Sequence, residues 1–366
     1  MLSVIIPTYN EEHNIIPVAR QIGIALQDRE YEIIFVDDST DGTLRVLEKL
    51  ALSNPRVRYI HRRGKRGLAT AVVAGFQIAK GDILAVMDAD LQHPPAVLPH
   101  LLNAIKKGND LVIASRFLPG GSDGGLTPAR RVISLTARCL GRLLLKKVRP
   151  ISDPMSGFFM LRREVVQGVH LTPLGWKILM EVLVRGRYQR VAEVPYAFRR
   201  RKEDHSKMTL AEQVNYLRHL LRLVLSSPED LRFWKFCLVG ASGVVMNMFF
   251  FLLLTRLLRL DVILSALVAT TLAMFSNFLL NDHFTWPGAR EDQFFSRTVK
   301  FFLCCTAGML INVAVLALLN GYLGLPAVCA NGAGILSATL WNYYANNRWT
   351  WTAQTARLAN ENPDSR

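Results

Sequence analysis

The sequence has few cysteines, and their arrangement excludes a disulfide framework. Only five occur among 366 residues. Four of them, Cys237, Cys304, Cys305 and Cys329, fall in apolar segments, and Cys139 stands alone. None has the spacing of a zinc site. We therefore expect neither a disulfide-stapled domain nor a cysteine metal centre.

The glycine patterns of two common nucleotide-binding loops are also missing. Gly64–Gly67 lacks the Gly-x-x-x-x-Gly-Lys-Ser/Thr spacing, so we interpret it as a strand-to-helix turn. No Gly-x-Gly-x-x-Gly follows the first predicted strand, which disfavours a dinucleotide oxidoreductase. The N-terminus has no signal-peptide pattern, since Met1 leads directly into an apolar strand. We expect the first domain to stay in the cytoplasm.

Charged residues become scarce after about Phe236. Two uncharged runs, Phe236–Thr255 and Val262–Asn281, are followed by a longer one, Phe301–Asn347. Because about 20 apolar residues span a bilayer, the long run must hold two helices, with a turn at Asn320–Pro326. The sequence thus predicts four spans, at about 236–255, 262–281, 301–320 and 325–347.

The charge distribution predicts the orientation of these spans. An even number of spans places both termini on one side, and the excess of Lys and Arg before Phe236 makes that side cytoplasmic. Arg256 and Arg259 oppose this weakly, although their long side chains could reach the interface. We expect a multi-pass membrane protein with domains at 1–207 and 231–353, an interfacial helix or linker at 208–230 and a polar tail at 354–366.

An internal repeat runs through the membrane half. A shift of 65 residues aligns nine pairs of identical residues. They are Arg232 and Arg297, Lys235 and Lys300, Phe236 and Phe301, Gly243 and Gly308, Asn247 and Asn312, Asn277 and Asn342, Asn281 and Asn346, Thr285 and Thr350, and Trp286 and Trp351. We interpret this as a duplicated two-helix unit in parallel orientation. Interhelical hydrogen bonding by the Asn residues is favoured over a transport or lipid-headgroup role.

The N-terminal half alternates short β-rich runs with helical patterns. Alternation of this kind predicts βαβ units and a mostly parallel sheet, with ligands at the carboxyl ends of the strands. The helical stretches include Asn14–Leu26 and Leu68–Ala79. The expected strands are Leu2–Pro7, Glu32–Val36, Val57–Ile60, Ile83–Met87 and Leu111–Ala114.

Positive charge is in excess, with a formal net charge of +15. Together with membrane spans, it favours an anionic membrane surface or a phosphorylated substrate over nucleic acid. Basic residues cluster between Arg130 and Arg149 and again at Arg199–Lys202, although a merely solvated basic face is the alternative. Leu210–Leu225 has an amphipathic pattern that fits an interfacial helix or a packed surface helix.

Two acidic clusters follow predicted strands. Asp88 and Asp90 come after Ile83–Met87, and continued strand geometry would point both carboxylates to one face. Paired hard oxygen ligands suit Mg²⁺ or Mn²⁺, whereas an isolated Asp-x-Asp is more often a turn. Asp37 and Asp38 follow the second strand, where Asx-turn chemistry competes with hydrogen bonding to a nucleoside.

Four segments together resemble a known family. Pro7–Glu11, Val36–Thr43, Asp88–Pro95 and Ser152–Phe159 occur in the order found in dolichol-phosphate mannose synthases, which are inverting glycosyltransferases of the GT-A fold. The resemblance covers about Met1–Lys207. The membrane half resembles GtrA-like four-helix domains. The implied fold is a Rossmann-like GT-A α/β catalytic domain followed by an all-α four-helix transmembrane domain.

The resemblance implies a role for each matching residue. Nucleotide binding is implied for Pro7, Tyr9, Glu11, Val36, Asp38, Asp88 and Ala89. Asp88, Asp90 and Gln92 would surround the metal, and Arg116, Arg130 and Ser134 would hold the acceptor phosphate. Catalytic roles are implied for Asp90, Arg116, Arg130, Lys177 and Arg201, with Ser206 and Lys207 on a loop that closes over the donor. Asp204 stands where the family has Gly, which puts closure of that loop in doubt.

The implied reaction transfers a hexose to dolichyl or polyprenyl phosphate, with mannose from GDP-mannose as the first choice. A phosphate acceptor is already anionic, so positioning and charge neutralisation need no general base. UDP-glucose or an aminosugar donor is the enzymatic alternative, and a lipid-linked sugar flippase with an associated transferase is the other. The expected partners are the nucleotide sugar, the polyprenyl phosphate and membrane lipids. Formation of an oligomer through the transmembrane domain is a further possibility.

Overall fold

The computed structural model describes residues 1–64, 67–125, 128–199, 210–288 and 293–352. The chain divides into two compact units, Met1–Ser227 and Pro228–Arg366. Each has its own buried hydrophobic cluster, one on the strands of the first unit and one on the aromatic residues of the second.

A seven-stranded sheet organises the first unit, in the order β3-β2-β1-β4-β6-β5-β7. Pairing is parallel except at β6, which runs antiparallel to β4 and β5. The α/β prediction is therefore confirmed, and the predicted strands agree with the observed ones to within about a residue. The strands are β1 Leu2–Thr8, β2 Tyr31–Asp37, β3 Val57–His61, β4 Ile83–Val86, β5 Leu111–Ser115, β6 Phe159–Arg162 and β7 Val191–Pro195.

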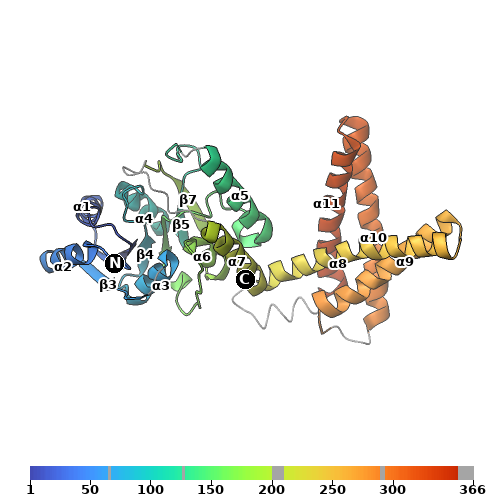
Figure 1. Ribbon diagram of the computed structural model, residues 1–366, viewed down its shortest axis with the longest axis horizontal. Helices are drawn as coiled ribbons and strands as arrows, with labels where there is room; N and C mark the ends of the chain where they lie inside the picture. The colour runs from blue at the N-terminus through green and yellow to red at the C-terminus, as the bar shows by residue number, and fades with distance from the viewer. Residues whose placement is uncertain (65–66, 126–127, 200–209, 289–292, 353–366) are drawn as a thin grey trace. The chain divides into compact units, whose positions relative to one another are not determined.

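Helices pack on both faces of this sheet (Figure 1). Apolar residues of α1, α2 and α4 join Val4 and Ile6 in one cluster. On the other face, a Cβ on Gly75 of α3 would lie 2.4 Å from Ile5 Cγ2, so only glycine lets this helix approach β1 so closely. The helices are α1 Ile15–Ala25, α2 Thr43–Ser53, α3 Leu68–Ile78, α4 Leu98–Lys106, α5 Pro128–Leu144, α6 Ile178–Arg185 and α7 Leu210–Ser226.

The second unit contains four helices among its described residues. They are α8 Pro228–Leu252, α9 Val262–Leu280, α10 Phe294–Leu316 and α11 Ala327–Ala345. Three segments are long and apolar enough to cross a membrane: Pro228–Leu257, Val262–Thr285 and Phe294–Tyr322. Two of them begin earlier than predicted, at Pro228 and Phe294, because a helix can continue through polar turns beyond the hydrocarbon.

The helices of the second unit form two hairpins, α8 with α9 and α10 with α11, as Figure 1 shows in yellow to red. Their contacts repeat at the predicted 65-residue shift. Asn277 packs on Gly243 in one hairpin as Asn342 packs on Gly308 in the other. The duplicated two-helix unit is therefore confirmed.

A cluster of six residues joins the two hairpins, and we refer to it as the tryptophan cluster. The indole rings of Trp286 and Trp351 stack in parallel with centroids 4.3 Å apart. Each indole nitrogen donates to the opposite repeat, Trp286 to Asn347 Oδ1 at 3.1 Å and Trp351 to Asp282 Oδ1 at 2.8 Å. Arg232 donates to the same oxygen of Asn347 at 3.3 Å, whereas Arg297 makes two hydrogen bonds to the Asp282 carboxylate.

Candidate active site

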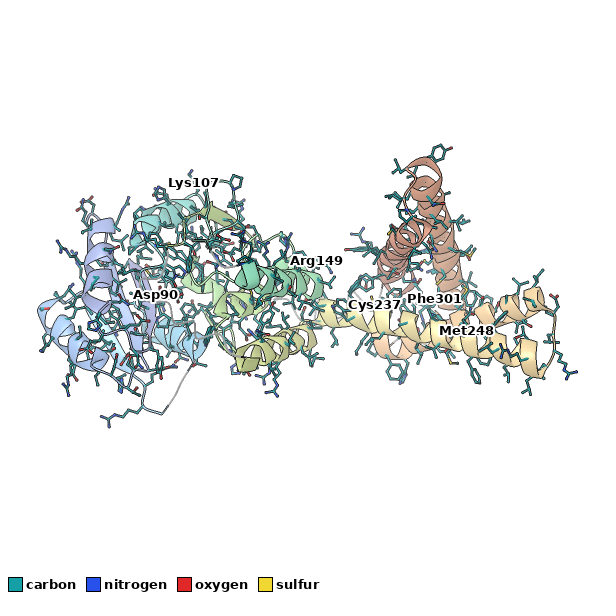
Figure 2. All side chains as sticks on the ribbon, turned by 45° about the horizontal axis from the view of Figure 1, so that its top comes forward. Asp90, Lys107, Arg149, Cys237, Met248 and Phe301 are labelled. Atoms are coloured by element: carbon teal, nitrogen blue, oxygen red, sulfur yellow. The ribbon has the colours of Figure 1, made fainter. Side chains whose placement is uncertain are left out.

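The carboxyl ends of β1, β2 and β4 meet at one edge of the sheet. Register pairs Pro7 with Val36 and Thr8 with Asp37, and the Met87 N–H donates to the Ile5 carbonyl at 3.2 Å. This edge brings the predicted nucleotide-binding residues of three strand ends together: Pro7, Tyr9, Glu11, Val36, Asp38, Asp88 and Ala89. Figure 2 labels Asp90 of the same loop.

Asp38 is held by an arginine that sequence reasoning missed. Arg62 donates from Nε to one Asp38 oxygen at 2.7 Å and from Nη2 to the other at 2.5 Å. Both side chains are nearly buried. Next to this pair, His61 Nδ1 lies 2.8 Å from the carboxylate of fully buried Asp37. The sequence could have indicated this pair, because His61 ends the parallel strand β3 and Arg62 follows it at the same edge of the sheet.

Asp88–Asp90 occupies a turn rather than a strand. β4 ends at Val86, so the two-residue alternation assumed from the sequence does not extend to the carboxylates. The turn is fixed instead by Leu91 in the left-handed region at φ 60° and by the Gln92 N–H, which donates to Asp90 Oδ1 at 3.1 Å. Strained backbone of this kind is frequent at functional sites.

His93 holds this turn through a hydrogen bond to its backbone. Its ring stacks on Phe158 at 5.3 Å, and Nδ1 accepts a hydrogen bond from the Asp88 N–H at 3.1 Å. Complete burial lowers the pKa of His93 to about 4, with Asp90 opposing the shift and Arg116 adding to it. The imidazole is therefore neutral at physiological pH and can act as an acceptor toward Asp88.

The metal prediction can be tested against the space around the two carboxylates. A Cβ on Gly157 would lie 3.1 Å from Asp88 Oδ2, so glycine leaves that oxygen room for a ligand. The described residues contain no group of three or more His, Cys, Asp or Glu side chains arranged for a metal ion. Two carboxylates and an amide oxygen are the kind of ligands that fit a cation that keeps water or phosphate oxygens as its other ligands.

Arg116 lies at the end of β5 and is held by a buried carboxylate. Nε and Nη2 donate to the two oxygens of Asp153 at 2.8 and 2.9 Å, and Asp153 is fully buried. Burial alone lowers the pKa of Arg116, but the hydrogen bonds and the charge of Asp153 outweigh burial and raise it. These bonds use Nε and Nη2.

The other predicted acceptor and loop residues differ in how far they can be placed. Ser134 lies half-buried on α5, and Lys177 stands just before α6. The side chain of Arg130, and all of Arg201, Ser206 and Lys207, fall outside the described residues.

Arg138 is a further basic residue at this place. Its guanidinium lies 3.9 Å above the ring of Phe117, and the neighbouring Arg116 lies 5.3 Å from the same ring. Arg130, Ser134 and Arg138 follow one another at intervals of four residues, which places them on one face of a helix. This spacing could have identified Arg138 from the sequence.

The sequence matches two known protein families, one in each half of the chain. Residues 3–169 match Glycosyl transferase family 2, and residues 235–351 match the GtrA/DPMS transmembrane domain. The dolichol-phosphate mannosyltransferase of Pyrococcus furiosus is 42% identical over 351 residues, which cover 96% of this chain and 99% of that protein. The chain belongs to the dolichol-phosphate mannosyltransferase family. It is a membrane-associated glycosyltransferase.

Other members and a more distant structure also match. The dolichol-phosphate mannosyltransferase of Saccharomyces cerevisiae is 37% identical over 265 residues, which cover 69% of this chain and 93% of that protein. Among solved structures, mannosyl-3-phosphoglycerate synthase from Rubrobacter xylanophilus has 20% identity and a TM-score of 0.48, over 61% of this chain and 74% of that one. The matches in sequence confirm the family resemblance inferred from the four segments.

Proposed function

We propose that this mannosyltransferase transfers mannose from GDP-mannose to a polyprenyl or dolichyl phosphate, with inversion at the anomeric carbon. Its relatives are named for mannosyl transfer to dolichol phosphate. The observation that supports the proposal most directly is the closeness of the acidic turn to Arg116. The ring of Phe198 lies 5.6 Å from the ring of His93, which accepts from the Asp88 N–H, and 5.5 Å from the guanidinium of Arg116.

Asp38 is proposed to select the guanine base. Its two carboxylate oxygens accept two nearly parallel N–H donors from Arg62. Guanine offers the same paired donors from N1 and N2, whereas uracil offers a single ring N–H. Displacement of Arg62 by guanine would therefore keep both oxygens of Asp38 satisfied, as a buried carboxylate requires.

Asp88, Asp90 and Gln92 are proposed to hold Mg²⁺ or Mn²⁺. A divalent cation bound there would neutralise charge on the donor diphosphate. The acceptor phosphate oxygen attacks the anomeric carbon, the bond from that carbon to the diphosphate oxygen breaks, and GDP leaves with the electron pair. Attack from the face opposite GDP inverts the configuration.

Arg116, Arg130 and Ser134 are proposed to hold the attacking phosphate. Asp153 keeps the Arg116 guanidinium in one orientation, so the arginine binds phosphate without first losing its own freedom. Because the phosphate is anionic before it binds, its oxygen needs no proton removed. Lys177 and Arg201 are proposed to add positive charge near the donor. Arg201 would do so from the loop that closes over it.

The C-terminal unit is proposed to cross the membrane four times, with α11 as the fourth span. The catalytic domain and both termini of the chain would then lie in the cytoplasm. Domain limits of 1–207, 208–230, 231–353 and 354–366 remain part of this proposal. Exposed apolar side chains on α5 and α7, among them Val132, Leu135, Leu217 and Leu221, suit contact with the acyl boundary.

The metal-dependent part of the proposal is tested by a matched pair of substitutions near β4. Asp90→Asn should abolish transfer, whereas Asp82→Asn, at the opposite end of the strand and 87% exposed, should leave it unchanged. Treatment of the wild-type protein with EDTA should also abolish transfer, and Mg²⁺ or Mn²⁺ should restore it. Substantial transfer in EDTA would contradict the metal assignment.

A further inference from the structure

Glu181 is a buried carboxylate outside the site described above. It lies on α6, where every residue from Ile178 to Val184 is buried, and its side chain is only 1% exposed. Burial of a charge without compensation is strongly unfavourable. The hydrogen-bond donors that surround it therefore require an explanation.

Two segments supply hydrogen-bond donors, and Arg185 supplies a positive charge. Oε1 accepts the backbone N–H of Thr172 at 2.9 Å, and the guanidinium of Arg185 lies 3.0 Å from the same oxygen. Oε2 lies 2.7 Å from Nε2 of His219, on α7. Burial raises the pKa of Glu181, but the bonds from His219 and Thr172 and the charge of Arg185 together lower it. The carboxylate is thus charged and joins α6, α7 and the segment before Lys177.

The tautomer of His219 follows from its surroundings. Its side chain is 1% exposed, and within the described part of the chain Nδ1 has no hydrogen-bond partner. A proton on Nδ1 would be a buried donor without an acceptor, whereas a lone pair there is less unfavourable. We therefore place the proton on Nε2, where it is donated to Glu181.

The segment before Lys177 is tied at several points. Arg185 Nη1 donates to the His170 carbonyl at 3.2 Å, and Glu181 accepts from Thr172 two residues later. The Gly175 carbonyl accepts from the Ala69 N–H at 3.4 Å, at the start of α3. Lys177 follows as the residue directly before α6. Glu181 lies one helical turn beyond Lys177 and accepts a hydrogen bond from Thr172, which precedes Lys177. It therefore holds the chain on both sides of that lysine.

α7 has two faces with different surroundings. His219, Leu220 and Leu223 are buried against the domain, and the Tyr216 hydroxyl donates to the Ala137 carbonyl of α5 at 2.6 Å. The opposite face exposes four aliphatic side chains: Val214, Leu217, Leu221 and Leu225. One face of the helix therefore contacts Glu181, and the other exposes the apolar side chains proposed above to contact lipid.

We propose that Glu181 and His219 are positioning residues that couple the placement of α7 to the placement of Lys177 for acceptor transfer. This rests on the function proposed above, in which Lys177 contributes to the reaction. A buried carboxylate held by hydrogen bonds contributes little net stability compared with apolar packing, but it specifies a unique arrangement of the segments that it joins. Here those segments are α7 and the chain on either side of Lys177.

The test is a double-mutant cycle on the full-length protein in lipid nanodiscs. His219→Leu removes the donor to Glu181 and should lower kcat/KM for polyprenyl phosphate by about tenfold, since interacting residues show coupling of this order. His219→Gln, which can place an amide N–H near the position of Nε2, should recover most of that loss. Tyr216→Phe removes another bond that holds α7 and should leave kcat/KM within about twofold.

The decisive comparison uses Lys177→Ala. In that background His219→Leu should cause little further loss, and binding of GDP should be unchanged in every variant. If the losses from Lys177→Ala and His219→Leu multiply, or if Tyr216→Phe matches His219→Leu, the coupling is wrong and the proposed reaction still stands. If Lys177→Ala itself has no effect on transfer, the role proposed for Lys177 fails. Should His219→Leu not fold, Glu181→Gln, which keeps size and loses charge, replaces it with the same expected outcomes.

Discussion

The imidazole of His93 stacks on Phe158 and accepts a hydrogen bond from the Asp88 backbone. Substitution can separate these two contributions. His93→Phe keeps an aromatic ring but removes the acceptor, so it should lower turnover by about tenfold or more through a displaced acidic turn, since a single hydrogen bond contributes roughly 1 kcal/mol and misplacement adds to its loss. His93→Asn, whose Oδ1 can replace Nδ1, should be more active than the Phe variant. Equal activity of both variants would contradict the role of the acceptor.

Arg116 and Asp153 give a second prediction at the scale of single residues. Arg116→Lys loses the planar fork and should raise KM for the lipid phosphate while leaving binding of GDP unchanged. Asp153→Asn keeps the shape but loses the charge that orients the guanidinium, so it should change acceptor KM in the same direction but less. Steady-state kinetics with each substrate varied in turn measure both effects. Weaker GDP binding with an unchanged acceptor KM would place Arg116 at the donor instead.

At the scale of helices and strands, local sequence patterns were sufficient to locate the strands that are buried. Mostly apolar runs located β1, β2, β4 and β5, because strands buried on both faces are rich in apolar residues. The start of α8 was misplaced by eight residues, from Phe236 to Pro228, because hydropathy marks the bilayer and not the end of hydrogen bonding.

The contacts between distant segments could not be predicted from the sequence. Arg62 pairs with Asp38, and Asp153 pairs with Arg116, across 24 and 37 positions of the chain. A single sequence gives the charges but not which of several acids a given arginine meets. The family resemblance identified Asp38 and Arg116 as site residues, but their buried partners required the fold.

The tryptophan cluster allows a prediction about positions 282 and 347, which are equivalent in the two repeats but carry Asp and Asn. Arg297 donates to Asp282, whereas its counterpart Arg232 donates to the neutral Asn347. Asp282→Asn should lower the free energy of unfolding by about 1.5–3 kcal/mol, the range for hydrogen bonds to charged groups. Asn347→Asp gives Arg232 a counter-ion and should leave stability unchanged or raise it. Thermal unfolding in one detergent measures both, and a comparable loss for the two variants would contradict the asymmetry.

For the whole molecule, the proposed lipid acceptor explains why a transferase domain is joined to a membrane domain. The polyprenyl tail of the acceptor cannot leave the bilayer, since each exposed CH₂ costs about 0.8 kcal/mol. A chain that ends at Ser227 should therefore bind GDP-mannose but transfer poorly to a long-chain acceptor in membranes. A short, water-soluble prenyl phosphate should partly restore turnover. Full activity of the truncated chain on the long-chain lipid would instead favour a flippase or partner-binding role for the C-terminal unit.

The central claim is that the protein forms a mannosyl phosphate on a polyprenyl carrier. Purified full-length protein in nanodiscs that contain polyprenyl phosphate should be given GDP-mannose, UDP-glucose and UDP-N-acetylglucosamine in separate reactions, with the Asp90→Asn variant as control. The account predicts a lipid product from GDP-mannose alone, with the β configuration when analysed by NMR, and none from the variant. A product from UDP-glucose in preference to GDP-mannose, or an α-linked mannosyl lipid, would contradict it.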